Sequence, residues 1–130
     1  MTLFHVIIPG RVAIKKNSRR LIANRRRMLI LPSKVYMQWE ADALRALTRA
    51  NRAQGFPLPG QLKAYMLFRF KNRSNEPDID NLLGGPLDVL QKAGIIENDR
   101  QILVVNAEKR FGETPSVEII LEAFMAEQAG

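Results

Sequence analysis

The sequence of 130 residues contains 46% hydrophobic residues and no cysteine, and it has a net charge of +7 at pH 7. This length is typical of one domain, and the hydrophobic fraction excludes an intrinsically disordered chain. The lack of cysteine excludes disulfides, zinc–thiolate sites and cysteine nucleophiles, and no apolar run approaches the roughly 20 residues of a membrane span. The apolar start lacks the preceding charged segment of a signal peptide, which favours a cytoplasmic protein.

The positive charge is concentrated near the N-terminus. Residues 1–39 hold nine Lys or Arg and no acid, whereas residues 40–130 hold eleven basic and thirteen acidic residues, a net of 11 − 13 = −2. A dense basic block is typical of an arm or loop that binds nucleic-acid phosphates, although a solvated surface would have the same composition. The block consists of Lys15, Lys16, Arg19, Arg20, Arg25, Arg26 and Arg27.

In the first half of the chain, the apolar residues 3–8 predict a buried strand that ends at Pro9-Gly10. Residues 11–27 have no regular period and predict a basic loop or irregular hairpin, from which residues 28–31 return as a short strand. Ser33 is a suitable N-cap for a helix whose apolar positions recur at helical spacing up to about Arg52.

In the second half, strict alternation over residues 62–70 predicts the clearest strand of the chain. A polar loop over residues 71–77 should precede a helix that ends near Lys92, with Gly94 as its C-terminal cap. Strands are expected at 102–105 and 117–121, before a frayed tail at 125–130. This order predicts an α/β (α+β) fold: one domain over residues 1–130, with a mixed sheet of four to five strands and two main helices.

Three aspartates are candidates for metal binding, namely Asp78, Asp80 and Asp99. Carboxylates suit hard ions such as Mg²⁺ or Mn²⁺, and the i, i+2 spacing of the first two puts both side chains on one face of an extended segment. The ordinary alternative is that Asp80 is only a helix N-cap and that Asp99 only begins a turn. A helix of about twelve residues spans roughly 18 Å, so Asp99 must join the pair from a returning loop or strand, or from a second subunit.

The segment that carries these aspartates resembles the signature of the RusA-type Holliday junction resolvases. The matching runs are Asp78-Ile-Asp80-Asn81-Leu82, Leu87-Asp88-Val89-Leu90-Gln91-Lys92-Ala93-Gly94 and Glu97-Asn98-Asp99-Arg100-Gln101-Ile102. Weaker similarity extends to residues 6–10, 32–36 and 109–119, and thus to most of the chain.

This resemblance implies a small homodimeric endodeoxyribonuclease, bacterial or phage-encoded, that resolves four-way DNA junctions by paired nicks in recombination and repair. It implies Mg²⁺, or Mn²⁺, as the cofactor, branched DNA as the partner, and neither a membrane nor an organic cofactor. The family's catalytic, metal-binding aspartates fall on Asp78, Asp80 and Asp99.

One position departs from the family pattern. The family often has a catalytic lysine where this chain has Gly84, and Lys71, Arg73, Lys92 and Lys109 are the candidates to replace it. The run Gly84-Gly85-Pro86 also predicts a helix that is kinked or that begins only at the proline. The alternative function is therefore a weakened or inactive junction-binding protein of the same fold.

Three further residues have competing interpretations. Asp88 is either part of the site or a salt-bridge partner, whereas His5 is expected to be structural and Trp39 to be a core residue rather than a base-stacking platform.

Overall fold

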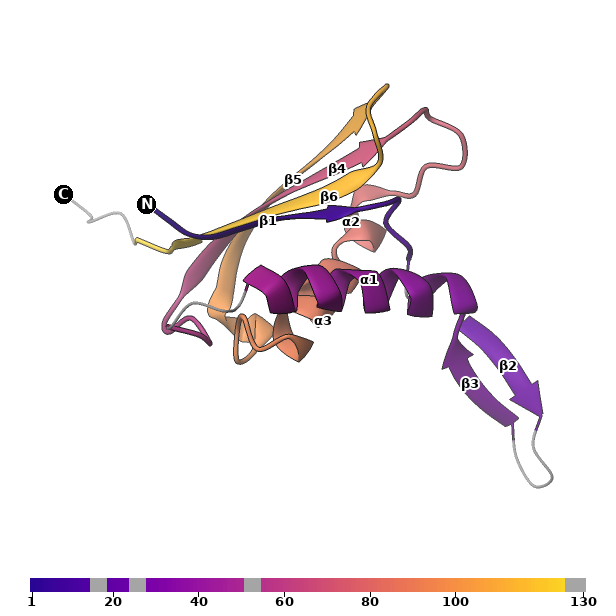
Figure 1. Ribbon diagram of the computed structural model, residues 1–130, viewed down its shortest axis with the longest axis horizontal. Coiled ribbons are helices and arrows are strands. Elements are labelled where there is room, and N and C mark those ends of the chain that lie inside the picture. Colours follow the sequence, from indigo (N-terminus) through magenta and orange to yellow (C-terminus); the bar gives the residue numbers. More distant parts are fainter. Residues whose placement is uncertain (15–18, 24–27, 51–54, 126–130) are drawn as a thin grey trace.

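The computed structural model describes residues 1–14, 19–23, 28–50 and 55–125, which form a four-stranded sheet, helices and a separate two-stranded ribbon (Figure 1). The strand order in the sheet is β1-β6-β4-β5, with β1 at Thr2–Pro9, β4 at Leu62–Phe70, β5 at Ile102–Phe111 and β6 at Ser116–Ala123. Neighbours are antiparallel except β4 and β5, which are parallel. The predicted α+β architecture with a mixed sheet and two main helices is therefore confirmed.

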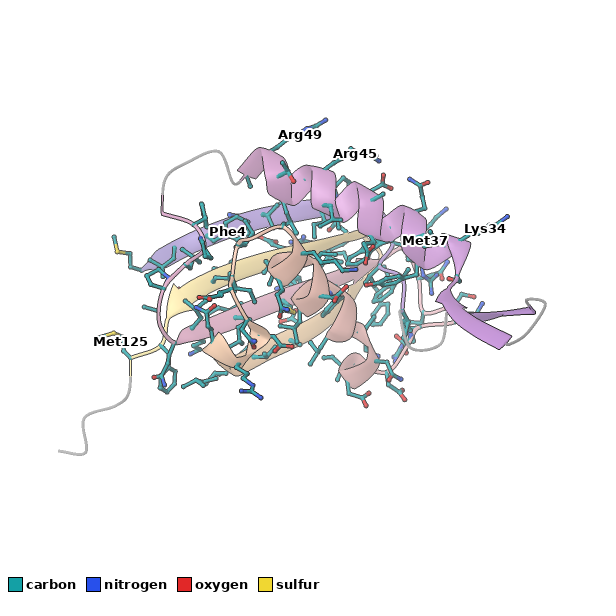
Figure 2. The ribbon with its side chains drawn as sticks, turned by 90° about the horizontal axis from the view of Figure 1, so that it is seen from below. Phe4, Lys34, Met37, Arg45, Arg49 and Met125 are labelled. Atoms are coloured by element: carbon teal, nitrogen blue, oxygen red, sulfur yellow. The ribbon has the colours of Figure 1, made fainter. Side chains whose placement is uncertain are left out.

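The helices cover one face of the sheet. Helix α1 spans Lys34–Ala50 and buries Tyr36, Trp39, Ala43 and Leu47, which is the predicted apolar stripe. The Ser33 hydroxyl accepts a hydrogen bond from the Tyr36 N–H at 3.1 Å, so the predicted N-cap is present. Figure 2 shows α1 lying over the sheet, with Arg45 and Arg49 pointing away from it.

A crossover connection joins the parallel strands β4 and β5. It contains the short helix α2 at Ile79–Leu82, the helix α3 at Gly84–Lys92 and a 3-10 turn at Asp99–Gln101. Gly94 follows α3 with a φ of 75°, a left-handed conformation that suits a glycine cap. Since β4 alternates buried and half-buried residues, its apolar side faces these helices.

The structure refines three of the predicted elements. Of the loop and the hairpin expected for the basic segment, the hairpin is present: β2 at Arg19–Ala23 pairs antiparallel with β3 at Met28–Pro32, the predicted returning strand, in a ribbon outside the main sheet. Strand β5 continues to Phe111 rather than ending at residue 105. The helix after residue 77 is interrupted at Leu83, and its second part begins at Gly84 rather than at the proline.

None of the helices in the described ranges has the length and apolar character needed to cross a bilayer.

Candidate active site

The loop of residues 71–77 carries the chain from the end of β4 to Asp78. Arg11, which follows β1, donates from its Nη2 to the carbonyl oxygens of Ser74 and Asn75 at 3.3 and 2.9 Å. The same guanidinium lies 5.4 Å from the centre of the Phe70 ring, within the range of a cation–π contact. Arg11 therefore ties the loop to the edge of the folded core.

Glu76 is a second anchor of this loop. Its Oε1 accepts hydrogen bonds from Arg73 Nε and Nη2 at 3.0 and 2.6 Å, and the Arg73 guanidinium packs over the Phe111 ring. The arginine holds the pKa of the Glu76 carboxyl below its usual range, with a smaller contribution from Lys109. Glu76 therefore stays ionised and keeps the turn before Asp78 in place.

Lys109 contacts the aspartate segment from β5. Its Nζ donates to the Pro77 carbonyl oxygen at 3.0 Å and lies 3.8 Å from Glu76 Oε2. The Pro77 carbonyl belongs to the peptide bond that leads into Asp78, so this ammonium is one peptide away from the first candidate ligand. Sequence reasoning named Lys109 only as one of several candidates, because nothing in the spacing of residues 78 and 109 indicates the contact.

Asp78 and Asp80 lie together at the start of α2, and both are exposed. Asp78 occupies the N-cap position with extended backbone but makes no capping bond through its side chain, and Asp80 lies in the first helical turn. The expectation of a fully extended segment and the alternative that Asp80 is the N-cap are therefore both wrong. Neither carboxylate has a hydrogen-bond or ion-pair partner among the side chains that the structure describes.

Asp99 lies at the other end of the crossover. Its N–H donates to Gln91 Oε1 at 3.1 Å, which places it beside the C-terminal end of α3, whereas Asp78 and Asp80 precede α3. Asn98 and Gln101 form a capping box that fixes the 3-10 turn. Within residues 1–14, 19–23, 28–50 and 55–125, no three acidic or histidine side chains gather closely enough to hold an ion. One chain thus brings Asp78 and Asp80 together but leaves Asp99 apart.

The glycines at the start of α3 have different roles. A Cβ at Gly85 would lie 3.0 Å from the Trp39 ring, so this glycine permits the close approach of α3 to α1. A Cβ at Gly84 would meet no atom within 4 Å. Trp39 is only 4% exposed, which confirms the expectation that it is a core residue.

Asp88 takes part in a polar cluster between α1 and α3. Lys92 Nζ lies 3.2 Å from Asp88 Oδ2 and donates to Glu40 Oε2 at 2.9 Å. Burial, together with the Asp88 and Glu40 carboxylates, raises the pKa of the Tyr36 hydroxyl, so the tyrosine stays neutral. This cluster favours the salt-bridge interpretation of Asp88, and it engages Lys92 away from the aspartate pair.

The predicted DNA-binding block lies largely outside the described residues, which include none of Lys15, Lys16, Arg25, Arg26 and Arg27. Arg19 and Arg20 belong to β2, whose backbone alone is described. The ribbon of β2 and β3 directly precedes α1 and projects from the body of the molecule (Figure 1).

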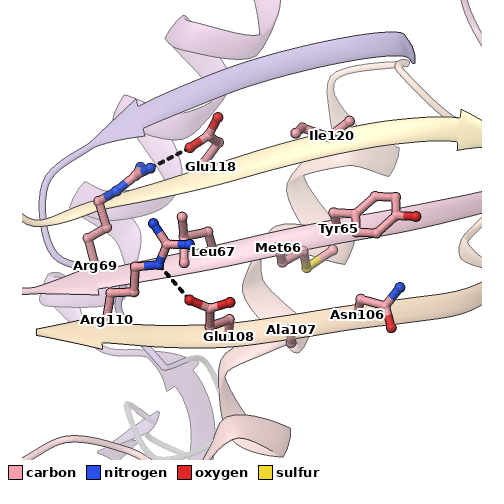
Figure 3. A pocket seen from close by; sticks show the side chains of 10 residues that line it. All are labelled: Tyr65, Met66, Leu67, Arg69, Asn106, Ala107, Glu108, Arg110, Glu118 and Ile120. Carbon is pink, nitrogen blue, oxygen red and sulfur yellow. Dashed lines mark hydrogen bonds and ion pairs between the residues drawn. The ribbon is translucent and has the colours of Figure 1, made fainter. Parts of the chain in front are cut away.

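The open face of the sheet also forms a shallow pocket, but its charged groups are paired with one another (Figure 3). Arg69 donates to Glu118 at 2.6 Å, and Arg110 pairs with Glu108. His5, expected to be structural, lies 2.6 Å from the second Glu118 oxygen. Among the side chains that the structure describes, this face thus offers no set of free carboxylates comparable to Asp78 and Asp80.

Two comparisons with known proteins address the family of this chain. A search of curated proteins found no match. The family model described as endodeoxyribonuclease RusA matches residues 9–122, a range that includes the loop of residues 71–77, all three candidate aspartates and Lys109. Because this match covers nearly the whole chain, the protein belongs to the RusA family of endodeoxyribonucleases.

Proposed function

We propose that this protein is a metal-dependent, structure-specific endodeoxyribonuclease that resolves four-way DNA junctions by paired nicks in recombination and repair. The main support is the exposed Asp78–Asp80 pair, which lies at the end of an anchored loop in a chain of this family. Cationic side chains are concentrated at that loop, because Arg11 and Lys109 contact it and Arg73 belongs to it. Such a surface attracts the phosphates of DNA to the two carboxylates.

The donor set fits Mg²⁺ or Mn²⁺. Magnesium is commonly held by one or two carboxylates together with substrate phosphates, and Asp78 and Asp80 are two carboxylates without competing partners among the described side chains. When bound, the ion would supply Lewis-acid chemistry at a backbone phosphate. The protein's own residues would hold the ion and orient its ligands. The two aspartates would bind the ion, and Lys109 and Glu76 would fix the peptide segment that precedes the aspartates.

We further propose that Asp99 completes this site from a second copy of the chain. Asp99 and the aspartate pair are at opposite ends of the crossover between β4 and β5, so one chain does not provide all three ligands to one ion. A two-fold homodimer would contain two equivalent sites, each with Asp78 and Asp80 from one copy and Asp99 from the other. Two such sites suit the two equivalent strands of a four-way junction.

The second candidate function is junction binding with weak or no cleavage. The observation that favours it is Gly84, which leaves the first turn of α3 without the cationic side chain that the family often has there. Lys109 reaches the peptide before Asp78 from β5 and is the best-placed replacement among the described cations.

Cleavage of a labelled synthetic four-way junction separates the two functions. The wild-type protein should nick two opposed strands with Mg²⁺ present and none when the metal is chelated. Asp78→Asn, Asp80→Asn and Asp99→Asn should each abolish nicking yet bind the junction as well as the wild type or better, because repulsion of the phosphates is reduced. Asp42→Asn, on the exposed side of α1, is the matched control and should nick normally. Junction binding by a wild-type protein that never nicks would favour the second function.

A further inference from the structure

The side-chain amide of Gln101 fixes the main chain of the turn that carries Asp99. Its Oε1 accepts hydrogen bonds from the backbone N–H groups of Glu97 and Asn98 at 2.8 and 3.2 Å. These two residues immediately precede Asp99, and Gln101 lies just after it in the same 3-10 turn. From this geometry we infer that Gln101 is a positioning residue of the metal site, which holds the turn so that the Asp99 carboxylate is presented to the ion. The inference rests on the proposed function, in which Asp99 is a metal ligand.

The same amide also ties the turn to the hydrophobic core. Its Nε2 donates to the carbonyl oxygens of Leu58 and Gly60 at 2.7 and 2.9 Å. Leu58 is 8% exposed, and its N–H donates to the Ile95 carbonyl oxygen at 2.8 Å, so this segment is itself anchored. A glutamine amide has two N–H donors and an oxygen that accepts two hydrogen bonds. All four of these positions are used, and the turn therefore cannot shift without breaking bonds to a fixed part of the fold.

The main chain around Asp99 is held at each residue, whereas the carboxylate stays available. The Asp99 N–H donates to Gln91 Oε1 at 3.1 Å, and the Arg100 N–H donates to Asn98 Oδ1 at 2.8 Å. With the two bonds described above, each backbone N–H from residue 97 to residue 100 has a side-chain acceptor. The Asp99 side chain is exposed and has no hydrogen-bond or ion-pair partner among the side chains that the structure describes. This combination suits a metal ligand whose supports act through the main chain.

The alternative is that these bonds only stabilise the turn. The Gln101→Met variant separates the two roles, because methionine has nearly the length of glutamine but lacks the amide. Removal of a group that orients a metal ligand typically lowers metal affinity by about 10–100-fold. Removal of a purely structural bond lowers the unfolding temperature and leaves the affinity of the folded protein for the metal unchanged.

Mn²⁺ binding to the whole chain, measured without DNA by electron paramagnetic resonance of the free ion, tests the positioning role. Gln101→Met should raise the Mn²⁺ dissociation constant by about tenfold or more. In an Asp99→Asn background, the same change should alter this constant by less than about twofold, because both substitutions act through one ligand. Gln38→Met is the matched control, because it removes a glutamine hydrogen bond to Asp42 on the exposed side of α1 and should leave Mn²⁺ binding unchanged.

Circular dichroism establishes that each variant is folded. If Gln101→Met does not fold, Gln101→Glu takes its place and should show the same loss, because its carboxylate still accepts from the turn but cannot donate to the two carbonyl oxygens. A folded variant that binds Mn²⁺ as tightly as the wild type would overturn the inference, as would a loss that persists in the Asp99→Asn background. A wild type that binds Mn²⁺ no better than Asp99→Asn would also overturn it.

These measurements need no cleavage, so they separate the two proposals. The expected pattern of Mn²⁺ binding in a protein that never nicks a junction would reject the nuclease and retain the positioning role of Gln101. Nicking by the wild type, together with unchanged Mn²⁺ binding in Gln101→Met, would do the reverse.

Discussion

The proposal that each site is shared between two copies predicts that two inactive variants restore cleavage when they are mixed. In Asp80→Asn the damaged group belongs to the aspartate pair, and in Asp99→Asn it is the ligand from the other copy. Each variant alone should lose about 100-fold or more in nicking, the scale seen when one electrostatic group of an active site is removed. A mixed dimer has one fully intact site and one site that lacks both groups.

The length of β5 separates Asp99 from the aspartate pair within one chain. Ile102 and Lys109 are seven residues apart in β5, which corresponds to roughly 23 Å along the strand. Asp99 precedes the first of these residues, and the peptide before Asp78 contacts the side chain of the second. Oxygen ligands of one magnesium ion lie about 2 Å from it, hence roughly 4 Å or less from one another. A single chain would have to rearrange its whole crossover to close such a gap.

The assay follows nicking of a labelled four-way junction after equimolar variants have been mixed and allowed to exchange subunits. Random exchange makes about half of the dimers mixed, and each has one intact site of two, so roughly a quarter of the wild-type sites should return. The product should be a single nick rather than a symmetric pair. A mixture of Asp78→Asn and Asp80→Asn is the control, because no combination of these chains contains an intact site. If the mixture of Asp80→Asn and Asp99→Asn stays inactive although light scattering shows exchanging dimers, the shared site is refuted.

Four further predictions concern two glycines at the helix start, an ion pair and the basic block. The Gly84→Lys variant should fold normally, because a Cβ at this position meets no atom within 4 Å, and it should nick the junction faster than the wild type. The Gly85→Ala variant should lose about 1–2 kcal/mol of unfolding free energy, measured by thermal unfolding, because its Cβ would clash with the Trp39 ring. The hydrogen bond from Arg69, and secondly the one with His5, hold the pKa of Glu118 below its usual value of 4.5. The ionised Glu118 therefore stabilises the folded protein above pH 4.5, and this stabilisation is lost as the pH falls through the lower pKa of the folded state. Glu118→Gln should therefore cost about 1 kcal/mol at pH 7, and the difference from wild type should vanish in acid; a constant difference would contradict the assignment. Replacing the arginines at 25–27 with alanine should lower the slope of log affinity against log salt by roughly 0.9 per lost phosphate contact, whereas an unchanged slope would favour a solvated surface.

Local patterns in the sequence were sufficient for most of the fold. The alternation in residues 62–70, the serine cap before α1 and the glycine after α3 each act within a few residues, and all three are present in the structure. The sequence pattern did not predict the second half of β5, because apolar and polar residues do not alternate clearly there. Lys109 is charged although it lies on the side of the strand that faces the helices. Its aliphatic stem is covered there, while its ammonium reaches the Pro77 carbonyl, and only the three-dimensional arrangement shows this.

The candidate site was predictable in part for the same reason. The proximity of Asp78 and Asp80 follows from their spacing, but the position of Asp99 depends on where the crossover returns to the sheet. The contact of Gly85 with Trp39 likewise joins two helices that are far apart in the sequence. Such contacts depend on tertiary packing, for which a short motif contains no information.

The bonds from Arg11 to the loop of residues 71–77 have a consequence for the entropy of DNA binding. Ordering a free backbone costs about 1–2 kcal/mol per residue, so a loop of seven residues would cost on the order of 10 kcal/mol if the substrate had to immobilise it. Here the arginine, the Glu76 ion pair and the Lys109 contact already hold the loop in the folded protein. The ordering cost is thus met during folding, and the free energy of phosphate contacts remains available for distorting the DNA.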